Sequence, residues 1–193
     1  MVSVESQMLP LGTKAPEFTL PNTIDDQDLS LDKARGTNAT VVFFISNHCP
    51  YVIHIRDHFK AVYEGYNSRG VSFIAISAND IDSYPVDAPE HMKELAEEKG
   101  WQFPYCYDES QEVAKSYKAA CTPDFFLFDG DLKLYYRGQF DASRPKSNKP
   151  VTGEDLKKAL EVLLDGKEPP KVQIPSIGCN IKWKEGNEPE YFG

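Results

Sequence analysis

The feature that most constrains the fold is a change of hydrophobic period at residue 49. Residues 40–45 form a continuous β-branched and aromatic run, which predicts a strand buried on both faces. From Cys49 onward the apolar residues recur at steps of three and four, which predicts a helix ending near Gly70. Residues 71–77 repeat the buried-strand pattern. The sequence therefore predicts a βαβ unit with parallel strands and a right-handed crossover.

The remaining patterns complete a mixed sheet covered by helices on both faces. A short hairpin is predicted around residues 18–30, and a second one about the turn dipeptide Asp129-Gly130. Residues 1–166 are predicted to form one α/β domain, and residues 167–193 a proline-rich tail packed on it or extending from it. The other expected elements are helices over 87–99, 110–118 and 152–164 and a strand over 102–107.

Composition narrows the functional classes. The chain has 193 residues and a net charge of −9, which argues against nucleic acid and anionic membranes as partners. No apolar run approaches the roughly 20 residues that span a bilayer, and the first residues lack the pattern of a signal peptide. A cytoplasmic protein with reduced cysteines is expected. The four cysteines form no CxxC pair, so neither a metal site nor a cofactor is predicted.

Cys49 is the candidate catalytic residue. Between a strand and a helix its sulfur would face free backbone N–H groups and the positive end of the helix dipole, and both favour the thiolate. Pro50 suits the first helical position. Ser46 offers a hydroxyl to the sulfur or to a substrate, and His48 would favour the thiolate if protonated. The alternative is a small buried hydrophobic residue, but the strand-to-helix position favours a reactive cysteine.

An ordered set of motifs carries a family resemblance over about residues 12–165. The chain resembles the peroxiredoxin-like redoxins of the thioredoxin-like superfamily, the alkyl hydroperoxide reductase and thiol-specific antioxidant proteins. The resemblance implies a thioredoxin fold with an N-terminal hairpin and a helical insertion, Cys49 as the attacking cysteine, and a cis Thr122–Pro123 bond facing it. The motifs are Ala15-Pro16, Cys49-Pro50, Phe103-Pro104, Thr122-Pro123, Phe126-Leu127-Phe128-Asp129 and Tyr136-Arg137-Gly138.

The same resemblance assigns further roles. The residue before the cis proline pairs its backbone with an incoming disulfide substrate in this family, so Pro50, Thr122 and Pro123 are candidate substrate-binding residues. Arg137 is a candidate for polarising the Cys49 sulfur, with a surface salt bridge as the alternative.

Two departures from the family pattern matter. Val52 stands where thioredoxins carry their second cysteine, and Val42 replaces a proline of the peroxide pocket. A resolving thiol would therefore come from Cys121, two residues before Pro123, or from Cys179, in a tail segment that resembles a docking motif. Each has a packed, unreactive residue as its alternative. Cys106 is expected to be inert core.

Two functions follow as hypotheses. The first is a thiol-dependent oxidoreductase or antioxidant protein whose Cys49 thiolate attacks a peroxide or a disulfide, with an external thiol as reductant. The second is a non-catalytic thioredoxin-fold module that docks a protein partner, with the tail around Trp183 as the contact. The choice between peroxide and disulfide stays open, as does a homodimeric arrangement.

Overall fold

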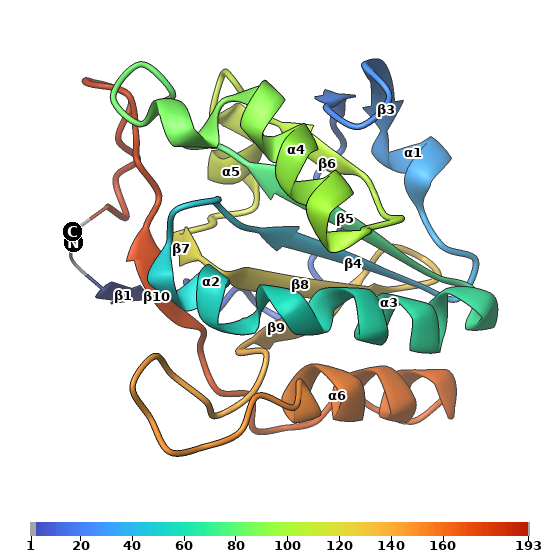
Figure 1. The fold of residues 1–193 in the computed structure, drawn as a ribbon. Helices are drawn as coiled ribbons and strands as arrows, with labels where there is room; N and C mark the ends of the chain where they lie inside the picture. The colour runs from blue at the N-terminus through green and yellow to red at the C-terminus, as the bar shows by residue number, and fades with distance from the viewer. Residues whose placement is uncertain (1–2, 193) are drawn as a thin grey trace.

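The computed structural model describes residues 3–192. Its main sheet has seven strands in the order β3-β2-β6-β5-β4-β8-β9, with β4 parallel to β5 and antiparallel to β8 (Figure 1). The predicted mixed α/β fold is confirmed. The strands are β2 (Thr19–Asn22), β3 (Gln27–Ser30), β4 (Ala39–Phe44), β5 (Val71–Ser77), β6 (Tyr105–Tyr107), β8 (Asp124–Asp129) and β9 (Leu134–Gly138).

Two hydrophobic clusters sandwich this sheet. Strand β4 contributes Val41 and Phe43 to one cluster and Val42 and Phe44 to the other, as expected for a strand buried on both faces. One face is covered by α2 (Pro50–Ile55), α3 (Phe59–Tyr66), α4 (Pro89–Lys99) and α6 (Glu154–Leu164). The other is covered by α1 (Leu31–Ala34), α5 (Glu112–Ser116) and part of the tail.

The long helix predicted after Cys49 is segmented. Segment α2 is followed by the 3₁₀ turn η1 (Arg56–His58), then by α3 and by η2 (Asn67–Arg69). Gly70 closes the run at φ 76°, a left-handed conformation that suits glycine. The apolar period continues through η1 because a 3₁₀ turn shifts the helical phase only slightly.

The tail is ordered and forms part of a second sheet. Its strand β10 (Ile177–Asn180) lies between β1 (Ser3–Glu5) and β7 (Cys121–Thr122), pairing antiparallel with both. Figure 1 shows this three-stranded sheet beside α2, at one end of the main sheet. Beyond it, Ile181 and Trp183 are buried in the second cluster. The tail segment is thereby fixed over the strand-to-helix junction.

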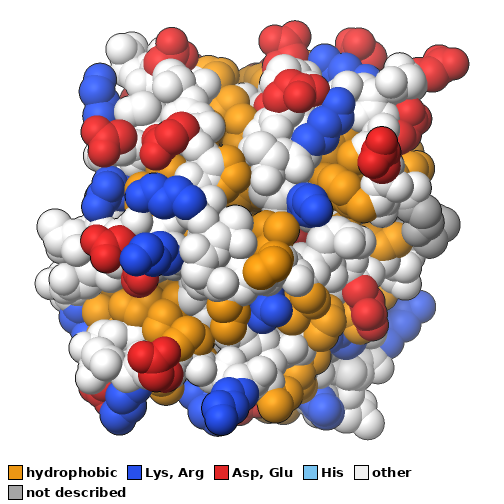
Figure 2. Space-filling view, turned by 180° about the vertical axis from the view of Figure 1, so that it is seen from behind, with side chains coloured by type: hydrophobic (Ala, Val, Ile, Leu, Met, Phe, Trp, Pro, Cys, Tyr) orange, Lys and Arg blue, Asp and Glu red, His pale blue; other side chains and the backbone are white. Residues whose placement is uncertain are grey.

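The surface seen from behind carries acidic and basic side chains interspersed with small apolar patches (Figure 2). The net charge of −9 is therefore not gathered into one acidic area on this face. Within residues 3–192, no helix is long and apolar enough to cross a membrane.

Candidate active site

Cys49 lies at the junction between β4 and α2, as the sequence predicts. It is the N-cap residue of α2, with extended backbone angles, and Pro50 occupies the first helical position. Its carbonyl accepts a hydrogen bond from Ile53 N at 2.9 Å, the first of the helix. The side chain is completely buried. The N-cap position thus places the Cys49 sulfur at the start of helix α2.

The peptide bond between Thr122 and Pro123 is cis and faces this sulfur. The Cys49 thiol donates to the Thr122 carbonyl at 3.0 Å. The Thr122 hydroxyl lies 3.4 Å from the hydroxyl of Ser46, and both are buried. The structure therefore brings together four of the predicted residues: Cys49, Ser46, Thr122 and Pro123.

Strand β10 places Cys179 against the same sulfur. Cys179 stands opposite Thr122 in the β10–β7 register, so both side chains project on one face. Gly178 makes this close approach feasible, because a Cβ there would lie 2.0 Å from the Thr122 carbonyl oxygen. The Cys179 side chain is 4% exposed, and it acts on the pKa of Cys49 as a hydrogen-bond partner.

The two sulfurs shift each other's pKa in opposite directions. The hydrogen bond from Cys179, opposed by burial and aided by the Thr122 hydroxyl and the Val52 N–H, lowers the pKa of Cys49 to about 6. The pKa of Cys179 is raised, because its proton is shared with Cys49, its sulfur is buried and the Cys49 charge is close. These directions make Cys49 the more acidic of the two thiols, and its hydrogen bond to the Thr122 carbonyl is lost when Cys49 ionises.

The other two cysteines differ from this pair. Cys121 is fully buried, its thiol donates to the Pro123 carbonyl at 3.5 Å, and burial raises its pKa well above the ordinary value. Successive residues of a strand face opposite sides, so β7 turns Thr122 and not Cys121 toward Cys179. Burial also raises the pKa of Cys106 to about 12. Of the two candidate resolving thiols, the structure brings Cys179 to Cys49.

Arg137 lies elsewhere in the fold. Its guanidinium donates to the Leu9 carbonyl at 2.6 Å and to the Gln173 side chain at 2.6 Å. It ties an N-terminal segment and the tail to β9. These two hydrogen bonds engage the guanidinium with a main-chain oxygen and an amide oxygen, and the sulfur-polarising role implied by the resemblance stays a prediction.

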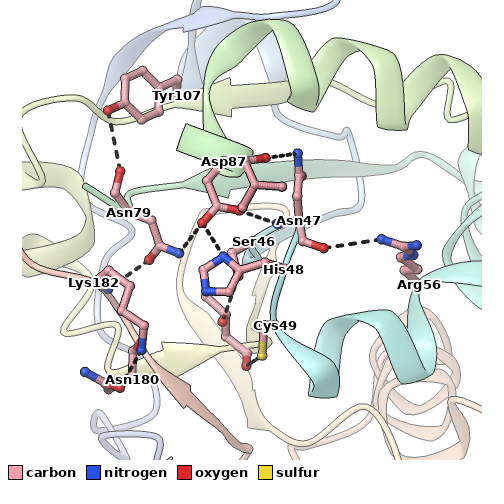
Figure 3. Close-up of polar contacts among 12 residues, drawn as sticks. Ser46, Asn47, His48, Cys49, Arg56, Asn79, Asp87, Tyr107, Asn180 and Lys182 are labelled. Carbon is pink, nitrogen blue, oxygen red and sulfur yellow. Dashed lines mark hydrogen bonds and ion pairs between the residues drawn. The ribbon is translucent and has the colours of Figure 1, made fainter. Parts of the chain in front are cut away.

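A hydrogen-bonded network beside the cysteine pair was not predicted (Figure 3). His48 Nδ1 lies 2.7 Å from Asp87, a fully buried carboxylate that also accepts from Asn79 Nδ2 and from the Asn47 backbone N–H, each at 2.7 Å. The side-chain oxygen Oδ1 of Asn79 accepts from the Lys182 backbone N–H at 2.9 Å, which connects the network to the tail. Asp87 belongs to η3 (Pro85–Asp87), a turn flanked by prolines that the sequence pattern assigned to a helix start.

A hollow opens next to the covered sulfurs. It is bordered by Tyr51 of α2, by Pro123, by Arg144 and by Ile177 of β10. Pro123 follows Thr122, and Ile177 lies two residues before Cys179, so this hollow borders the segments that cover Cys49. Among the described residues, no group of three His, Cys, Asp or Glu side chains is arranged to hold a metal.

Comparisons with known proteins agree with this geometry. The family model of the AhpC/TSA family matches residues 11–137. Thiol-disulfide oxidoreductase ResA of Bacillus anthracis is 22% identical over 157 residues, covering 81% of this chain and 78% of ResA. A structure of an uncharacterized conserved protein from Geobacillus kaustophilus superposes with a TM-score of 0.93 at 54% identity, covering 95% of this chain and 97% of that one.

A more distant structure shows the fold alone. Peroxidoxin BcpB from Mycobacterium tuberculosis has a TM-score of 0.60 at 17% identity, covering 81% of this chain and 97% of that one. Together with the buried cysteine at a strand-to-helix junction and the cis proline opposite it, these likenesses lead to one assignment: the chain belongs to the AhpC/TSA family, with a thioredoxin fold.

Proposed function

We propose that this chain is a thiol-dependent oxidoreductase in which Cys49 attacks a disulfide and Cys179 resolves the product. The observation that carries the proposal is the position of Cys179 on strand β10, directly opposite Thr122, whose carbonyl oxygen lies 3.0 Å from the Cys49 sulfur. The depressed pKa of Cys49 supports its role as nucleophile, since the thiolate is the attacking form. Membership of the AhpC/TSA family and the name of the ResA relative support the same chemistry.

The reaction has two exchange steps. The Cys49 thiolate attacks one sulfur of a disulfide RSSR, a Cys49–S–S–R bond forms, and the other sulfur leaves as a thiolate. Cys179 then loses its proton, attacks the Cys49 sulfur and displaces the second RS⁻. The substrate gains two electrons, and the protein is left with a Cys49–Cys179 disulfide. An external thiol reductant would return it to the dithiol.

Access to Cys49 requires movement, because both sulfurs are covered. A substrate would reach Cys49 when β10 leaves β7, entering from the hollow bordered by Pro123 and Ile177. Strand β10 pairs with β7 through Cys179 and Asn180 and with β1 through Ile177–Cys179, so the pairing with β7 must break before a substrate can reach the sulfur. The covering strand is therefore the element that admits the substrate and supplies the second thiol.

Peroxide is the second candidate substrate. The hydroxyls of Ser46 and Thr122 beside the sulfur favour it, because they can hold a peroxide oxygen. Cys49 would become a sulfenic acid, and Cys179 would displace water from it to form the same disulfide. An antioxidant role, cytoplasmic placement and homodimer formation remain predictions. The alternative of a partner-docking module is less well supported, because the tail that was to be its contact surface packs on the site.

The test is a disulfide map after limited oxidation. Reduced protein is treated with one equivalent of oxidised glutathione or hydrogen peroxide, quenched with an alkylating agent, digested and analysed by mass spectrometry. We expect a Cys49–Cys179 linked peptide in the wild type and a trapped Cys49 adduct in Cys179→Ser. Cys106→Ser is the control and should behave as the wild type. An unmodified Cys49, or a link from Cys49 to Cys121, would overturn the proposal.

A further inference from the structure

The network around His48 has the form of an acid–base device. His48 immediately precedes Cys49 in the chain, and its ring stacks on Tyr84 with centroids 5.2 Å apart and planes within 4°. Asp87 binds Nδ1, which leaves Nε2 as the ring atom that exchanges a proton. A nucleophile beside a histidine that is itself oriented by a buried carboxylate is the arrangement by which proteins move a proton at a reacting atom.

The carboxylate that binds His48 belongs to Asp87, and hydrogen bonds fix its position. Asp87 is 0% exposed and accepts from His48, Asn79 and the Asn47 backbone, so its position is set by three partners at 2.7 Å each. Such a network orients the ring and stabilises its protonated form. The same Asn79 accepts from the backbone of Lys182, three residues after Cys179. The network thus contacts both the segment that carries Cys49 and the segment that carries Cys179.

The charges facing the imidazole come from each neighbouring segment. Asp87 raises the pKa of His48 by its hydrogen bond, burial lowers it, and the charges of Asp87 and Cys49 raise it, while Lys182 lowers it. The Tyr84 phenol ring also packs against the imidazole. Cys49, the next residue in the chain, is thus one of the charged groups that raise the pKa of His48.

The resolving step has a proton that needs an acceptor. In the reduced protein the Cys49 sulfur is the hydrogen-bond partner that raises the pKa of Cys179. Once Cys49 is in a mixed disulfide its sulfur carries no negative charge, and that acceptor is lost. We propose, resting on the function proposed above, that His48, positioned by Asp87, is the acid–base group of the Cys49–Cys179 pair.

The His48 imidazole takes the proton of Cys179, and Asp87 stabilises the resulting imidazolium. The Cys179 thiolate attacks the Cys49 sulfur, a Cys49–Cys179 bond forms, the Cys49–S–R bond breaks and RS⁻ leaves with the electron pair. The imidazolium then gives its proton to RS⁻, which leaves as RSH, and His48 is neutral again.

The test follows the two exchange steps separately. Reduced protein is mixed with Ellman's reagent, which releases one coloured thiolate when Cys49 attacks and a second when Cys179 resolves. We expect His48→Gln to slow the second release by roughly a hundredfold, the lower range of general acid–base catalysis. The rise of the wild-type rate with pH through the titration of His48 should disappear in this variant. His58→Gln, an exposed histidine in η1, is the matched control and should leave both phases unchanged.

A second variant separates proton transfer from mere support of the fold. Asp87→Asn keeps the side-chain shape but removes the charge that raises the pKa of His48, so the rate profile should move to lower pH. Loss of thermal stability alone would not move it. Equal second-phase rates and pH profiles in His48→Gln and His58→Gln would overturn this inference while leaving the proposed function intact. Absence of any second release in the wild type would instead refute Cys179 as the resolving thiol.

Discussion

The dependence of the Cys49 pKa on Cys179 gives the sharpest test of the site. The substitution Cys179→Ala removes the thiol whose hydrogen bond is the largest cause of the depressed pKa, and it leaves the backbone of β10 in place. The Thr122 hydroxyl and the Val52 N–H still act on the sulfur. The variant therefore isolates the contribution of one donor.

The size of the effect follows from the strength of such a bond. A hydrogen bond to a charged group contributes roughly 1.5–3 kcal/mol, and one pKa unit corresponds to about 1.4 kcal/mol. Greater hydration of Cys49 beside the smaller alanine offsets part of this loss, because burial acts in the opposite direction. We expect the pKa of Cys49 to rise from about 6 by roughly one unit. At pH near the wild-type midpoint, the thiolate fraction then falls about fivefold.

The assay is a titration of thiolate ultraviolet absorbance, which needs no reagent to reach the buried sulfur. Burial raises the pKa values of Cys106 and Cys121, so neither ionises in the neutral range and the signal belongs to Cys49. Cys106→Ala is the matched control and should keep the wild-type midpoint. Cys179→Ser, whose hydroxyl still donates, should show a smaller rise than Cys179→Ala. A wild-type midpoint in Cys179→Ala would refute the assignment of Cys179 as the stabilising donor.

Three further perturbations test the surroundings. Gly178→Ala should separate β10 from β7 and speed alkylation of Cys49. The control Gly65→Ala, whose Cβ would enter open space, should leave the alkylation rate unchanged. Equal alkylation rates in the two variants would contradict the close packing of Gly178 on Thr122. Thr122→Val should raise the pKa of Cys49 by up to roughly one unit in the same titration, since it removes a hydroxyl donor. Burial raises the pKa of Asp124 to about 8, so the folded state binds the extra proton and stability should decline as pH rises from about 4 to 8. Asp124→Asn should lack this decline in denaturant unfolding curves, and an unchanged slope would contradict it.

The reactive cysteine could be located from sequence because it depends on local features. A buried strand, a change of period and Pro50 together fix Cys49 at the start of a helix, and the Val52 N–H acts on its sulfur there as expected for a free first-turn donor. The strands β4 and β5 lie where their continuous apolar runs predict them, because a buried strand is also a local feature of the sequence. These features require no knowledge of which distant segments meet.

The tail strand and the histidine network depend on contacts between segments that are distant in sequence, so local patterns could not predict them. Strand β10 has only four residues and carries Gly178, so its pattern indicates no strand; pairing with β1 and β7 creates it. Asp87 has the sequence context of an ordinary helix start, and only the fold brings it 2.7 Å from His48. The helix predicted to begin at residue 87 begins at Pro89 instead, because Asp87 belongs to the preceding 3₁₀ turn, in which its carboxylate is buried.

The pairing of β1 with β10 has a practical consequence for handling the protein. Ser3 pairs with Cys179 itself, and Tyr191 and Phe192 border the same hollow as Ser3 and Val4. An affinity tag or fluorescent protein attached at either end therefore begins a few residues from the strand that covers the nucleophile. Reactivity measured on a tagged sample would include the pull of the tag on that strand, and cleavage of the tag is itself an informative control.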